Sequence, residues 1–175
     1  MSLLEELALR AENIVRMHGI YKPPVPVEEI VRKEGISLLV INLDPDMSGT
    51  LMRSGPEDMV VIAVNESHHR NRRRFTIAHE LGHFYLGHLA HHPHIDRQFT
   101  AINRDELSSQ ATDSREIEAN TFAANLLMPA DFLIKDFVKL GGVDQADLSR
   151  LALRYQVSEQ ALTYRLQGLG LLPPY

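Results

Sequence analysis

The stretch R-F-T-I-A-H-E-L-G-H, from Arg74 to His83, most constrains what this chain can fold into. His79 and His83 stand four positions apart, which places them on one face of a helix, one turn from each other. Two imidazoles in that arrangement can bind one metal ion. Glu80 lies between them and can point toward the same ion without binding it. The spacing therefore predicts a helix that carries a metal site, with Glu80 as the group that takes a proton from water there.

The sequence around this pattern is that of a buried helix. It holds no proline, and its apolar residues can pack one face against a core: Phe75, Ile77, Ala78, Leu81, Phe84, Tyr85 and Leu86. The alternative is a core helix with two incidental histidines. That alternative is disfavoured because buried His and Glu side chains need polar partners, which a metal site supplies.

Composition narrows the chemistry of the site and the class of protein. The chain has 175 residues, 44% of them hydrophobic, as expected for one globular domain. It contains no cysteine, so any metal ion must be held by His and carboxylate side chains. The net charge of −5 argues against nonspecific nucleic-acid binding by the whole chain. The N-terminus is acidic and amphipathic, and no apolar run has the length of a membrane span, which predicts a cytoplasmic protein.

A catalytic zinc ion takes three protein ligands and keeps one open position, so a third ligand is needed. A second strong helix is predicted over 112–128, ended by Pro129. Glu118 borders the apolar face that Ile117 and Phe122 indicate, whereas Glu116 points roughly 200° away from Glu118 at 100° per residue. Glu118 is therefore the preferred ligand. Spacing alone leaves open that it is an ordinary exposed glutamate.

Two separated motifs, F-T-I-A-H-E-L-G-H and E-I-E-A-N-T-F-A-A-N-L-L-M-P, resemble those of the ImmA/IrrE family of zinc metallopeptidases, and the likeness runs from about residue 27 to the C-terminus. The resemblance implies one catalytic Zn²⁺ held by His79, His83 and Glu118, with Glu80 as general base. It also implies a partner. Members of this family typically cleave, or bind and inactivate, helix-turn-helix repressors of phages, mobile elements and stress regulons, often encoded nearby.

The expected fold is α+β: a mainly helical domain with a small three-stranded antiparallel sheet and the motif helix at its core. One metallopeptidase domain is predicted over 1–175. Its parts are N-terminal helices (1–35), the sheet (36–64), the motif helix (69–89), the third-ligand helix (112–128) and C-terminal helices (131–172). Within the sheet, the segment Met47–Arg53 is the expected edge, where an extended substrate can add a strand.

Two further functions remain open beside a zinc endopeptidase. The first is a module that binds and sequesters a repressor, with the zinc purely structural. The second is DNA binding by the C-terminal segment, which resembles a helix-turn-helix unit and would present Glu159, Gln160, Thr163 and Arg165 to the bases. The acidic chain and the lack of a basic stripe disfavour DNA binding. A second metal site at His91, His92 and His94 is also disfavoured, and no role is assigned to the loop 88–94.

Overall fold

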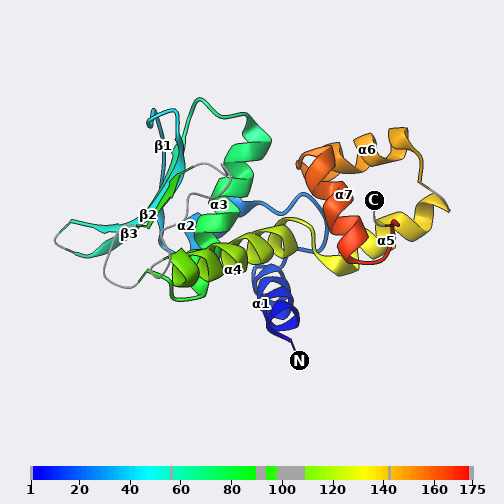
Figure 1. The fold of residues 1–175 in the computed structure, drawn as a ribbon, viewed down its shortest axis with the longest axis horizontal. Helices are drawn as coiled ribbons and strands as arrows, with labels where there is room; N and C mark the ends of the chain where they lie inside the picture. Colours follow the sequence, from blue (N-terminus) through cyan, green and yellow to red (C-terminus); the bar gives the residue numbers. More distant parts are fainter. Residues whose placement is uncertain (1, 56, 90–93, 98–108, 142, 174–175) are drawn as a thin grey trace. The chain divides into compact units, whose positions relative to one another are not determined.

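A computed structural model gives this chain an α+β fold and describes residues 2–55, 57–89, 94–97, 109–141 and 143–173 (Figure 1). Its backbone contacts form two compact units, one of Pro26–Ala123 and one of Met1–Val25 with Ala124–Tyr175. The predicted α+β class is confirmed. The single metallopeptidase domain over 1–175 stays a prediction.

The first unit, Pro26–Ala123, holds a sheet and the helices around it. Its elements are α2 (Val27–Lys33), β1 (Ser37–Ile41), β2 (Met47–Ser54), β3 (Met59–Asn65), α3 (Arg70–Tyr85), β4 (His94–Arg97) and most of α4 (Ser109–Leu127). The motif helix and the third-ligand helix thus form within a few residues of their predicted bounds.

The sheet differs from the predicted antiparallel one in its pairing. Within the described residues it has four strands in the order β1-β3-β2-β4. Strands β2 and β3 form an antiparallel pair, but β1 runs parallel to β3. The reason lies in the strand order. The chain leaves a gap one strand wide between β1 and β2, and β3 then occupies that gap. Strand β4 pairs with the other side of β2, so the prediction that Met47–Arg53 is a sheet edge is wrong.

A buried asparagine fixes the crossing between β1 and β2. Asn65 ends β3 and is fully buried. Its side-chain amide donates to the backbone carbonyls of Leu43, Asp44 and Met47, at 3.3, 3.2 and 2.9 Å. This one side chain thus binds three carbonyls along the chain that leads into β2, and the Asp44 carbonyl also accepts from the Met47 amide at 2.8 Å. The loop between β1 and β2 is therefore held by β3, the strand that lies between them in the sheet.

Helix α3 lies along the sheet, against β2 and β3 (Figure 1). The approach is close at Gly49 of β2, where an added Cβ would stand 2.4 Å from Cγ2 of Thr76 and 2.9 Å from the carbonyl oxygen of Ala63. Only a glycine leaves room for the helix at this distance. The apolar residues of α3 that close this core, Ile77, Ala78 and Leu81, are almost fully buried.

The second unit is helical. Its elements are α1 (Leu3–Met17), α5 (Ala130–Leu140), α6 (Gln145–Tyr155) and α7 (Glu159–Gly168), together with the last residues of α4. Helix α1 begins with a capping box in which Ser2 and Glu5 satisfy each other's backbone amides. Helices α6 and α7 are joined by a short turn at Gln156, which has a left-handed backbone.

Three of the four side chains proposed to read DNA bases are engaged with the protein itself. Arg165 donates to the Met128 carbonyl and to Oδ1 of Asn125, at 3.2 and 2.7 Å. Burial lowers the pKa of Arg165. The Thr163 hydroxyl donates to the Glu159 carbonyl, and the Glu159 carboxylate accepts from Gln145. These contacts count against base recognition by α7.

Candidate metal centre

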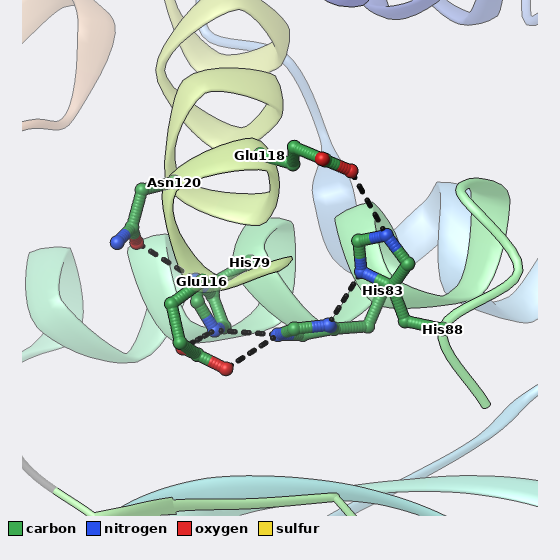
Figure 2. Close-up of polar contacts among 6 residues, drawn as sticks. All are labelled: His79, His83, His88, Glu116, Glu118 and Asn120. Atoms are coloured by element: carbon green, nitrogen blue, oxygen red, sulfur yellow. Dashed lines mark hydrogen bonds and ion pairs between the residues drawn. The ribbon is translucent and has the colours of Figure 1, made fainter. Parts of the chain in front are cut away.

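The two histidines of the motif and one glutamate of α4 converge (Figure 2). His79, His83 and Glu116 each present a ligand atom, and these atoms lie within 4.8 Å of one another. The Nε2 atoms of the histidines are 3.0 Å apart. The Glu116 carboxylate spans both, with one oxygen 3.2 Å from Nε2 of His79 and the other 3.4 Å from Nε2 of His83.

The donor set fits a divalent cation. Nδ1 of His79 faces Oδ1 of Asn120 at 2.8 Å, and because an amide oxygen can only accept, Nδ1 carries the proton. In the neutral ring, Nε2 of His79 is then a bare lone pair that faces a carboxylate. Two acceptors at that distance need a positive charge between them, which is a proton or a metal ion. Two imidazole nitrogens and a carboxylate form the ligand set of several catalytic zinc sites.

The structure brings Glu116, and not Glu118, to the histidine pair. The reason lies in the orientation of α4. Ile117, which the sequence suggested as a marker of the inward face, is 60% exposed, whereas Ala119 and Phe122 are fully buried. Glu116 and Asn120 stand one turn apart and both face α3. Glu116 therefore replaces Glu118 as the candidate third ligand.

A glycine within the motif sets the distance between the two helices. An added Cβ on Gly82 would stand 3.1 Å from both the Cα and the carbonyl oxygen of Ala119. The backbones of α3 and α4 thus approach closely where small residues meet, between the two histidines of the motif. This crossing is what allows a side chain as short as Glu116 to reach them. The sequence signal for this crossing is a small residue on each helix, Gly82 and Ala119. The argument from residue spacing did not use it.

Glu118 has another partner. Its Oε2 lies 3.1 Å from Nε2 of His88, and Nδ1 of His88 lies 3.0 Å from Nδ1 of His83 (Figure 2). Glu118 and His88 thus stand behind His83, on the side of its ring opposite to His79 and Glu116. Sequence reasoning assigned no role to His88.

Glu80, the expected general base, is fully buried on α3. It does not belong to the three-residue cluster, as expected for a group that acts on water and does not bind the metal.

Two tyrosines lie beside carboxylates that are not part of this centre. Burial and the Glu34 carboxylate raise the pKa of Tyr85, whose ring packs against Phe122. The Tyr155 hydroxyl donates to Asp136.

A family model described as IrrE N-terminal-like domain, Peptidase_M78, matches residues 33–167. The chain belongs to this metallopeptidase family. The match covers α3, the Glu116 region of α4 and the C-terminal helices. The predicted resemblance to the ImmA/IrrE family is therefore confirmed, and the cluster of His79, His83 and Glu116 is its possible metal site.

Two curated relatives agree with this family. An uncharacterized immunity region protein 2 of Bacillus phage phi105 is 32% identical over 147 residues, which is 79% of this chain and 85% of that protein. Metallopeptidase ImmA of Bacillus subtilis (strain 168) is 25% identical over 161 residues, covering 92% of this chain and 84% of the relative.

A solved structure shares the fold. A Mycobacterium tuberculosis transcriptional regulator superposes with a TM-score of 0.67 at 22% identity, over 93% of this chain. The chain spans 46% of that regulator's length.

One expectation lies outside the described residues. Residues 91 and 92 are not described, nor is the side chain of His94, so the candidate second metal site stays a prediction. Among the helices that the structure describes, none has both the length and the apolar character needed to cross a membrane.

Proposed function

We propose that this chain is a zinc endopeptidase whose substrate is a helix-turn-helix transcriptional repressor in the cytoplasm. The observation that carries the proposal is the convergence of His79, His83 and Glu116 beside a buried Glu80. Because the chain belongs to a metallopeptidase family, we assign metal binding to those three residues and proton transfer to Glu80. Zinc is proposed because two imidazoles and one carboxylate match its catalytic ligand sets, although such sites accept other divalent ions as well.

The chemistry divides between the ion and the side chains. When bound, zinc acts as a Lewis acid that polarises the scissile carbonyl and lowers the pKa of water toward neutral pH. Glu80 then acts as general base: its carboxylate takes the proton of the attacking water and delivers it to the leaving amine. Asn120 and the backbone contact between Gly82 and Ala119 keep His79 and Glu116 in place. The reaction adds one water molecule and yields a new carboxylate and a new amine.

The repressor substrate is supported by the family. Its members typically act on helix-turn-helix repressors, and one relative takes its name from a phage immunity region. Because a repressor binds DNA in the cytoplasm, this substrate also implies that the cleavage takes place in the cytoplasm. The alternative of a module that only sequesters a repressor uses the same surface but needs no proton transfer from Glu80.

The test is the intact mass of a candidate repressor, taken from a neighbouring gene, after incubation with zinc-loaded protein. We expect two fragments whose masses add up to the repressor plus one water. Glu80→Gln should retain zinc and produce no fragments. Glu57→Gln is the matched control because it makes the same change at an exposed position, and it should cleave like the unsubstituted protein.

Fragments that persist in Glu80→Gln would remove the general-base role. An unchanged repressor mass with a stable complex of the two proteins would replace the peptidase by the sequestering module. Salt-dependent binding of the zinc-loaded protein to duplex DNA, with no effect on any repressor, would favour the DNA-binding alternative.

A further inference from the structure

We propose that His88 and Glu118 are positioning residues, joined to His83 in a relay that holds its Nε2 toward the metal ion. The inference rests on the proposed metal site. It gives a role to a histidine that the two motifs do not include, and a different role to the glutamate that the sequence suggested as a ligand.

The relay is continuous and ends on a carboxylate. Nδ1 of His83 is 3.0 Å from Nδ1 of His88, and Nε2 of His88 is 3.1 Å from Oε2 of Glu118 (Figure 2). The His88 side chain is 9% exposed and that of Glu118 is 24% exposed, so solvent competes little for the inner contact. The other nitrogen of His83 faces His79 and Glu116. His83 is thus held by a hydrogen bond at Nδ1, and its Nε2 faces His79 and Glu116.

The chemistry of the three groups sets the direction of the hydrogen bonds. A carboxylate can only accept, so Nε2 of His88 donates to Glu118. When the His88 ring is neutral, its Nδ1 is then an acceptor, and Nδ1 of His83 must donate to it. That leaves the lone pair of His83 on Nε2, the atom that faces the metal site. Outer partners of this kind fix the tautomer and the orientation of a ligating histidine.

The backbone independently places His88 for this role. Gly87 has a φ of +74°, a left-handed conformation that ends α3. The Gly87 amide donates to the Phe84 carbonyl at 3.2 Å, and the His88 amide donates to the His83 carbonyl at 2.9 Å. These two bonds form a Schellman motif. In such motifs the first and last residues of the longer hydrogen bond commonly make an apolar contact. Here these residues are His83 and His88, and their imidazoles make the contact. The helix end itself therefore directs His88 toward His83.

A direct ligand and a positioning residue should respond differently to substitution. Removal of Glu118 should weaken zinc binding by about 10- to 100-fold, the usual loss for an outer-shell partner, while the number of protein ligands stays the same. Glu118→Gln keeps an oxygen that can accept from His88, so it should bind zinc more tightly than Glu118→Ala. His88→Ala should weaken zinc binding as Glu118→Ala does. Arg115→Ala, at an exposed position of α4, is the control and should change nothing.

The experiment measures the zinc dissociation constant by competition with a chelator, and the ligand number by X-ray absorption. The tautomer of His83 is measured by nitrogen-15 NMR on the metal-free protein at about pH 8.5, where imidazoles are neutral. We expect Nδ1–H at His83 in the unsubstituted protein, and a shift toward Nε2–H in Glu118→Ala and His88→Ala. A purely structural role for Glu118 would not move that tautomer.

Two results would overturn the relay. One is loss of a zinc ligand in Glu118→Ala, which would make Glu118 a direct ligand. The other is an unchanged zinc affinity together with an unchanged His83 tautomer in both variants. Failure of the unsubstituted protein to bind zinc would instead sink the proposed function, and the tautomer of the metal-free protein would still decide whether the relay exists.

Discussion

Glu116 and Glu118 stand two positions apart on α4 and face different partners. Glu116 faces both motif histidines, and Glu118 faces His88. Two residues along a helix correspond to a rotation of about 200°, so a helix that packs beside α3 cannot aim both carboxylates at one ion. Their separation gives each glutamate a distinct place in the centre, one in the candidate ligand set and one behind it.

The substitution Glu116→Ala should therefore abolish stoichiometric zinc binding. It removes the carboxylate that spans both Nε2 atoms and leaves two imidazoles, a set that binds zinc weakly. Zinc content after dialysis measures the effect, and thermal unfolding of the metal-free protein checks the fold. Because the Glu116 side chain is 30% exposed, the metal-free melting temperature should hardly change. Full zinc occupancy in this variant would remove Glu116 from the ligand set.

At the scale of elements, the centre depends on how closely α3 and α4 cross. The contact at Gly82 lies between the two candidate ligands His79 and His83, and its partner Ala119 lies three positions from Glu116 on α4. A change in the helix separation here therefore moves the two halves of the centre relative to each other.

We expect Gly82→Ala to destabilise the protein by about 1–3 kcal/mol, the usual cost of overpacking a close contact. It should also weaken zinc binding, because α4 must move away. Urea unfolding and chelator competition measure the two effects. The matched control is Gly168→Ala, where an added Cβ meets nothing within 4 Å. Better helix propensity should leave the control as stable as the parent or up to about 1 kcal/mol more stable. Equal stability changes in both variants would contradict the close crossing.

The sequence was sufficient to predict both helices of the centre and the histidine pair. The 3.6-residue period and the i, i+4 spacing are properties of one helix, and they need no knowledge of its neighbours. The inward face of α4 was misread because Ile117, an apolar residue, is exposed. The sheet was misread because the parallel pairing of β1 with β3 follows from the insertion of β3, which depends on distant contacts such as those of Asn65. Local pattern does not encode either choice.

At the scale of the whole molecule, two buried phenols link stability to alkaline pH. Burial, followed by Asp136, raises the pKa of Tyr155, and burial, followed by Glu34, raises the pKa of Tyr85. An acid whose pKa is raised on folding contributes stability that is present below its unfolded pKa of about 10 and is lost as the pH rises above it.

The free energy of unfolding should accordingly fall as the pH increases past about 10. Urea unfolding at a series of pH values measures this slope. Tyr155→Phe and Tyr85→Phe should each flatten it, while Tyr164→Phe, at an exposed position, should leave it unchanged. A slope that is the same in all three variants would show that neither buried phenol controls alkaline stability.

The division of the chain into units also has a consequence for its synthesis. Met1–Val25 leaves the ribosome before Pro26–Ala123, but the rest of its unit, Ala124–Tyr175, is made after that segment. About 100 residues separate the two segments, which at usual elongation rates is a delay of about 5 to 20 seconds. During that time the apolar side of α1, with Leu7, Ala11 and Ile14, has none of its later partners from Ala124–Tyr175. The nascent chain thus carries an exposed apolar helix that chaperones can bind until the C-terminal helices emerge.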